Sequence, residues 1–234
     1  MSGFSMVVGG ILPYVAIPAF LAMFVYRIVV WYRTPQPGKM TLFQGTGTTG
    51  NGLLSEALFF PSLFRGDKLL WVMAWFFHVA LALAFLGHFR VFTGAIDATL
   101  VSMGMSAGGI KTMSMVAGGG AGIMLLATAG LLFFRRLFSA RVREISGAPD
   151  FLALGLLIAV IVSGNVMRFG GGHFELAQTH IWAASLLSLS PLVPQDATFL
   201  AHILLAQALI VYIPFSKIMH SGGIFFTQAL VKRR

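Results

Sequence analysis

The chain has 234 residues, of which 57% are hydrophobic and 10% are charged, and its mean hydropathy is +0.87. A soluble domain carries about 25% charged residues, so this composition excludes a water-soluble enzyme, a disordered chain and a nucleic-acid-binding protein, despite the net charge of +9. The sequence has no cysteine, which excludes disulfides, thiolate metal sites, iron–sulfur clusters held by this chain and covalently attached haem.

Five segments are long and apolar enough to cross a bilayer, which takes about 20 residues because backbone polar groups in hydrocarbon must bond within the helix. We predict an all-α integral membrane protein, a five-helix bundle forming a single domain over residues 1–234, with spans at about 8–31, 69–92, 112–136, 151–169 and 196–219. A sixth charge-free window, Leu176–Gln195, contains Gln178, His180 and two prolines. We interpret this window as a surface or re-entrant segment.

The placement of basic residues predicts the orientation of the bundle. Lys and Arg accumulate in cytoplasmic loops. With the N-terminus outside and the C-terminus cytoplasmic, thirteen of them lie inside and three lie outside, namely Arg90, Lys111 and Arg168. The first basic residue is Arg27, so the first segment lacks the basic start of a secretory signal and is expected to stay as a span. The chain is therefore predicted to be a multi-pass protein of the cell (inner) membrane.

The inner loop after the first span becomes apolar again over Leu53–Phe64. This pattern predicts a short helix lying in the membrane interface, and the alternative is a docking surface for a soluble partner.

Four histidines lie within or next to two of the spans. His78 and His88 are in the second span, while His202 is in the fifth and His220 follows it closely. Ionisable residues inside spans are costly and usually mark function. Because the two spans run in opposite directions, we expect His78 to lie at the level of His220 near the inner face, and His88 at the level of His202 near the outer face. Eighteen residues make five helical turns, which predicts that His202 and His220 share one helix face, with a bend at Pro214.

Pairs of imidazoles at two depths favour haem over other ligands. Zinc sites usually add cysteine or carboxylate ligands, and a proton relay would need acidic residues, which the charge-free windows lack. Haem iron accepts imidazole, and a helix bundle can bury the apolar macrocycle. We therefore predict two haem b groups, ligated by the pairs His78/His220 and His88/His202. Candidate partners for the haem propionates are Lys217, Arg90 and Arg168, each of which could instead be an interfacial anchor. The remaining histidines, His173 and His180, are expected in a solvated outer connection.

These residues resemble the nitrate reductase gamma-subunit family of di-haem cytochromes b. The resemblance is carried by the spacing of His78 and His88, by the segment "GHFR" at 87–90 and by "PFSKIMH" at 214–220. Within the family, "GNVMRF" at 164–169 and "PFSKIMHSGGIFF" at 214–226 are most similar to the DsrM group, the membrane cytochromes of dissimilatory sulfite-reduction complexes.

The resemblance implies a menaquinol or menaquinone site near the outer haem and electron exchange with a cytoplasmic, DsrK-like iron–sulfur subunit and other subunits of a membrane complex. It also implies a lysine between spans two and three at the quinone site, a role that Lys111 could take. A nitrate-reductase-type quinol-oxidising subunit remains an alternative. So do a small transporter or channel lined by histidines and a structural anchor for a soluble complex.

Overall fold

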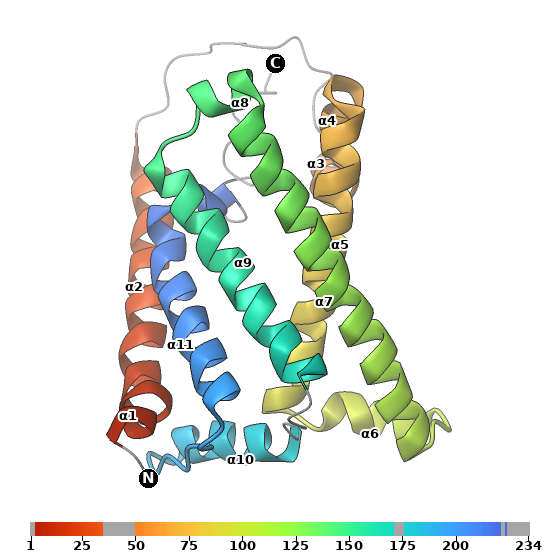
Figure 1. Cartoon of the computed structure of the whole chain (residues 1–234), viewed down its shortest axis with the longest axis vertical. Helices are drawn as coiled ribbons and strands as arrows, with labels where there is room; N and C mark the ends of the chain where they lie inside the picture. The colour runs from red at the N-terminus through yellow and green to blue at the C-terminus, as the bar shows by residue number, and fades with distance from the viewer. Residues whose placement is uncertain (1–2, 35–49, 171–175, 221–222, 224–234) are drawn as a thin grey trace.

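The computed structural model describes residues 3–34, 50–170, 176–220 and 223, and every regular element in these ranges is a helix. Within this part of the chain, five helical segments are long and apolar enough to span a membrane: Gly3–Arg33, Lys68–Phe92, Ala107–Phe138, Ala148–Phe169 and Ala197–Phe215. They form an upright bundle (Figure 1). The predicted all-α fold with five spans is confirmed, and the protein is a multi-pass membrane protein.

The first span consists of α1 (Gly3–Ser5), a π-helical turn (Met6–Ile11) and α2 (Leu12–Arg33). Pro13 has no N–H to donate to the carbonyls of the preceding turn. Two side chains from other segments supply these hydrogen bonds instead: Trp182 donates to the Gly9 oxygen at 2.8 Å and Gln207 to the Val8 oxygen at 3.0 Å. The irregular turn is thus tied to the last span, which satisfies backbone groups that the membrane cannot.

The segment predicted as one interfacial helix at 53–64 forms two short helices, α3 (Gly50–Phe59) and α4 (Pro61–Gly66). Phe60 lies between them in the left-handed conformation, at φ 49°. Asp67 then caps α5 (Lys68–Phe92) by accepting a hydrogen bond from the Leu70 amide at 2.9 Å. The same carboxylate pairs with Arg135 at 2.9 Å, which links the start of the second span to the end of the third.

The third and fourth spans pack through small residues. Helix α6 (Ala95–Ser102) leads into α7 (Ala107–Phe138), and α8 (Ala140–Glu144) leads into α9 (Ala148–Phe169). On α7, Gly122 allows a close approach of α9, because its carbonyl accepts a hydrogen bond from the Asn165 amide at 3.0 Å and a Cβ there would collide with the Asn165 side chain. Gly122 therefore serves helix packing, as small residues do in other membrane bundles.

Helix α10 (Leu176–Leu187) lies across one end of the bundle and does not run through it (Figure 1). Its Trp182 packs edge-on against Phe199 at 5.2 Å between ring centroids, and both side chains are buried. The sixth window is therefore a surface segment, one of the two forms expected. It leads into α11 (Ala197–Tyr212).

The last span ends earlier than predicted. Helix α11 stops at Tyr212, and two 3-10 turns follow, Ile213–Phe215 and Lys217–Met219. Pro214 cannot continue the α-helical hydrogen bonds, and Ser216 has an extended backbone with φ −114° and ψ 170°. The expected continuous helix to residue 219 is therefore not formed, and counting whole turns from His202 to His220 does not give their relative orientation.

The second to fifth spans pack in the order of the chain, and the first span packs against the fifth. Within the described residues, the closely packed pairs of spans are α5 with α7, α7 with α9, α9 with α11 and α11 with α2. These closely packed pairs do not include α5 with α11, the two helices that carry His78, His88 and His202. Many large apolar side chains on the bundle face outward, including Leu21, Phe85 and Val116, as expected for a surface covered by lipid.

Candidate functional site

Two pairs of histidine rings bridge α5 to the last span and the turns after it. At one end of the bundle, His88 lies next to His202, with ring centroids 6.2 Å apart and ring planes 19° from parallel. At the other end, His78 lies next to His220, with centroids 5.9 Å apart and planes 83° apart. We refer to these as the His202 end and the His220 end. The structure thus brings together the four histidines in the two couples expected from their depth, although the helix that was expected to carry His220 has already ended.

Hydrogen bonds fix which ring nitrogen of each histidine is free. The Nδ1 atoms of His78 and His88 lie 2.7 Å from the carbonyl oxygens four residues earlier, and Nδ1 of His220 lies 2.9 Å from the Lys217 oxygen. A carbonyl oxygen can only accept, so each Nδ1 carries the proton. In all three rings the Nε2 lone pair is therefore available to a metal ion, and the hydrogen bond at Nδ1 is the arrangement usual for metal-bound histidine.

For the fourth histidine, His202, the hydroxyl of Ser163 takes the place of the backbone carbonyl at Nδ1. This hydroxyl lies 2.9 Å from Nδ1 of His202 and donates its own hydrogen to the Val160 carbonyl, also at 2.9 Å. With that hydrogen on Val160, the hydroxyl oxygen accepts the proton of Nδ1 in the tautomer of His202 that leaves Nε2 free. Gly164 makes room for this ring, since a Cβ at that position would come within 3.2 Å of the His202 ring. Helix α9 thus orients a histidine of α11.

The spacing of the rings suits a metal ion held between them. A metal–imidazole bond is about 2 Å long, so two imidazoles on opposite sides of one ion have ring centres about 6 Å apart. Both pairs have this separation. Within the described residues, no three or more His, Cys, Asp or Glu side chains gather as metal ligands. Two protein ligands are enough for haem iron, whose other four ligands come from the porphyrin, and the residues present therefore fit haem.

The cations predicted to bind propionates differ in the partners they already have. Arg90 makes two hydrogen bonds to Asp97, at 2.6 and 2.8 Å, and this contact holds the pKa of the Asp97 carboxyl below its usual value. Arg168 donates to the neutral Ser114 carbonyl at 2.9 Å. Among the described residues, Arg168 is therefore the one of these two cations that makes no ion pair with a carboxylate.

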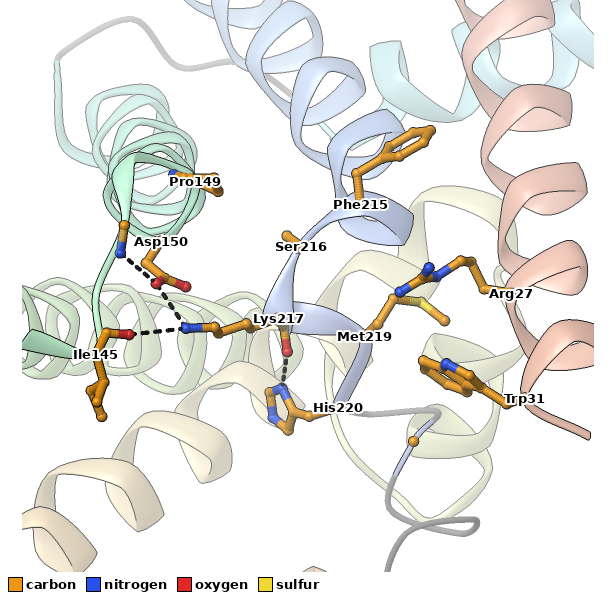
Figure 2. A pocket seen from close by; sticks show the side chains of 12 residues that line it. Arg27, Trp31, Ile145, Pro149, Asp150, Phe215, Ser216, Lys217, Met219 and His220 are labelled. Atoms are coloured by element: carbon orange, nitrogen blue, oxygen red, sulfur yellow. Dashed lines mark hydrogen bonds and ion pairs between the residues drawn. The ribbon is translucent and has the colours of Figure 1, made fainter. Parts of the chain in front are cut away.

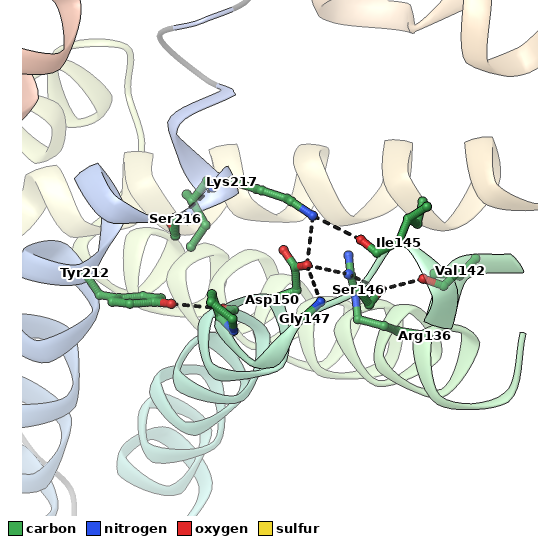
Figure 3. A network of polar contacts seen from close by, with 11 residues as sticks. Arg136, Val142, Ile145, Ser146, Gly147, Asp150, Tyr212, Ser216 and Lys217 are labelled. Atoms are coloured by element: carbon green, nitrogen blue, oxygen red, sulfur yellow. Dashed lines mark hydrogen bonds and ion pairs between the residues drawn. The ribbon is translucent and has the colours of Figure 1, made fainter. Parts of the chain in front are cut away.

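At the His220 end, Lys217 belongs to a polar network around Asp150 (Figure 3). The buried Asp150 carboxylate binds Lys217 at 2.8 Å, accepts a hydrogen bond from the Gly147 amide and lies 3.5 Å from Arg136. Lys217 also donates to the Ile145 carbonyl at 3.3 Å. The network attaches the turn that carries His220 to the start of α9, so Lys217 holds this turn in place and its charge is already balanced.

A cavity of about 810 Å³ opens beside this network (Figure 2). It lies at the His220 end, and its wall combines residues from the first span, from the start of α9 and from the turns after α11. The lining includes Arg27, Trp31, Pro149, Asp150, Met219 and His220. Figure 2 shows the Arg27 side chain pointing from α2 toward the segment that carries His220. The cavity thus adjoins one of the two histidine pairs.

The other predicted residues lie apart from the pairs or outside the described ranges. Lys111 is exposed on the first turns of α7, at the end of the bundle where α6 and α10 lie. His180 is on α10, and His173 lies outside the described residues.

Sequence reasoning missed Ser163 and Arg27. Ser163 is a polar residue inside a charge-free window, a signal that could have pointed to it. Arg27 looked like an ordinary basic residue at the end of a span.

The fold and the site define a class of protein: a five-span helical membrane protein with one histidine pair at each end of the bundle. Comparison with known families agrees. The family model described as "Nitrate reductase gamma subunit" matches residues 61–233, and the chain belongs to this family.

Three relatives illustrate its range. The chain is 29% identical to the Hdr-like menaquinol oxidoreductase cytochrome b-like subunit of Archaeoglobus fulgidus, over 94% of this chain and 77% of the relative. It is 29% identical to the respiratory nitrate reductase 1 gamma chain of Escherichia coli, over 62% and 67% of the two chains. It is 27% identical to the nitrate reductase gamma chain of Bacillus subtilis, over 94% and 91%.

Proposed function

We propose that this protein is the di-haem cytochrome b subunit of a respiratory membrane complex, moving electrons between menaquinol or menaquinone and an iron–sulfur subunit. The observation that carries the proposal is the meeting of four imidazoles as two cross-helix pairs, each with a separation that suits a metal ion and with Nδ1 engaged by an oxygen acceptor. The names of the relatives support quinol chemistry, since two kinds of relative are subunits of a menaquinol oxidoreductase or of nitrate reductase.

The residues of this chain would hold and orient the two groups. His78 and His220 would ligate one haem and His88 and His202 the other, and bound haem supplies one-electron transfer. With two imidazoles holding each haem, no coordination site would be left for oxygen, which favours electron transfer over oxygen chemistry. The two pairs lie at opposite ends of a bundle long enough to cross the membrane, so the arrangement suits electron passage from one face to the other.

The sides of the membrane follow from the basic residues. We place the His202 end outside, with quinone exchange there and Lys111 as a candidate quinone contact, and the His220 end on the cytoplasmic side next to an iron–sulfur partner of the DsrK kind. The segments "GNVMRF" and "PFSKIMHSGGIFF" favour dissimilatory sulfur metabolism. The rival assignment, a nitrate-reductase-type quinol-oxidising subunit, differs in the final acceptor and uses the same residues.

A reduced-minus-oxidised absorption spectrum of the purified protein, with haem extraction and iron determination, tests the proposal. We expect two b-type haems per chain. Replacement of His88 or His202 by alanine should remove one spectral component, and replacement of His78 or His220 the other. His180→Ala is the matched control, because this histidine lies on α10 outside both pairs, and both components should remain.

A colourless protein would contradict the proposal and favour a transporter lined by histidines. Loss of the same component in the His78 and His202 variants would contradict the pairing.

A further inference from the structure

Arg27 lines the cavity at the His220 end, and no carboxylate of the described residues forms an ion pair with it. Its Nε atom is buried and has no hydrogen-bond partner in the described part of the chain. Its guanidinium lies 5.6 Å from the centre of the Trp31 ring, a contact that holds the side chain in position but does not balance its charge. A buried donor without an acceptor costs free energy. The described part of the chain therefore does not supply the acceptor that Nε of Arg27 needs.

The acidic residue that lines this cavity does not complete the site. Asp150 lines the same cavity, but its carboxylate is occupied by Lys217, by the Gly147 amide and by Arg136. Asp150 balances the charge of Lys217. Among the described residues that line the cavity, the positive charge of Arg27 is therefore not balanced. The ligand that complements it is an anion with oxygen acceptors, for which the planar, forked guanidinium is the preferred partner.

His220 also lines this cavity. The centroid of its ring lies 5.9 Å from that of His78, its partner in the pair. We propose that the Arg27 guanidinium binds a carboxylate side chain of the haem held at the His220 end. This inference rests on the proposed function. It also gives the role of propionate partner at this end to Arg27 in place of Lys217, the residue predicted from the sequence, because Lys217 forms an ion pair with Asp150.

The test is the reduction potential of the haem at the His220 end in Arg27→Gln. A buried cation that balances a carboxylate favours the reduced haem, so its removal should lower the reduced-to-oxidised ratio at fixed potential by about tenfold, equivalent to about 59 mV for one electron. The haem at the His202 end should keep its potential. Arg27→Lys keeps the charge and should show a smaller shift. Arg33→Gln is the matched control, since Arg33 is an exposed cation at the end of the same helix, and it should change neither potential.

A second readout identifies the anion. The propionate-bending band in the resonance Raman spectrum responds to hydrogen bonds at the haem carboxylates, and we expect it to shift in both Arg27→Gln and Arg27→Lys. An unchanged band with loss of one bound phospholipid per chain would assign the anion to a lipid phosphate and overturn the inference.

Two haems with unaltered potentials in Arg27→Gln would also overturn the inference while leaving the proposed function intact. Absence of haem from the unaltered protein would overturn the proposed function itself.

Discussion

In each of the four paired histidines a hydrogen bond engages Nδ1 and leaves Nε2 free. Three of these bonds come from backbone carbonyls close in sequence, so they form wherever the local helix or turn forms. The fourth comes from Ser163, which lies 39 residues from His202 and on another span. The orientation of His202 therefore depends on how α9 and α11 pack, whereas the orientation of the other rings is local.

Replacement of Ser163 by alanine tests this dependence. The change removes the hydroxyl that contacts Nδ1 of His202 at 2.9 Å, and losses of this kind at metal-bound histidine weaken the metal site by about 10- to 100-fold. We expect the haem at the His202 end to be lost from Ser163→Ala at a lower concentration of a haem-binding competitor, as measured from its spectral component. Ser163→Thr, which keeps the hydroxyl, should retain the haem. Equal retention in both variants would show that the hydrogen bond does not support the ligand.

At the scale of the elements, the sequence predicts features that depend on neighbouring residues in the chain. It does not predict features that depend on how the helices pack. The five spans follow from runs of apolar residues, and the two histidine pairs follow from the opposite directions of two spans. The end of α11 was placed seven residues too late because an apolar run does not report where the helix stops: Pro214 and the extended Ser216 end it. The sequence marks Ser163 as a polar residue in an apolar span, but the contacts of Ser163 and Arg27 with residues distant in sequence could not be predicted from it.

The contact between α7 and α9 gives a second test at this scale. A methyl group at Gly122 would displace the Asn165 side chain and break its hydrogen bond to the Gly122 carbonyl. Overpacking typically costs 1–3 kcal/mol, so we expect Gly122→Ala to lower the free energy of unfolding by about 1–3 kcal/mol, measured as a lower thermal midpoint in detergent. Gly120→Ala is the matched control, because a Cβ there meets nothing within 4 Å. Equal midpoints for the two variants would contradict a packing role for Gly122.

At the scale of the whole molecule, the two pairs are useful for energy conversion only if they face defined sides of the membrane. An odd number of spans puts Gly3 and Phe215 at opposite ends of the bundle. The excess of Lys and Arg at the His220 end then favours this end as cytoplasmic. Moving one charge across the membrane is worth about 2.3 kcal/mol per 100 mV. In the proposed function, the orientation would therefore determine whether electron flow from quinol builds or consumes the membrane potential.

Labelling of single cysteines measures this orientation directly, because the chain has no cysteine of its own. Leu187 at the end of α10 and Phe138 at the end of α7 are 86% and 78% exposed and lie at opposite ends of the bundle. In intact cells without an outer membrane barrier, a membrane-impermeant maleimide should react with Leu187→Cys, and with Phe138→Cys only after the membrane is opened. The reverse pattern would place the His202 end in the cytoplasm. Quinone exchange and the iron–sulfur partner would then have to change sides, although the haem ligands would stay the same.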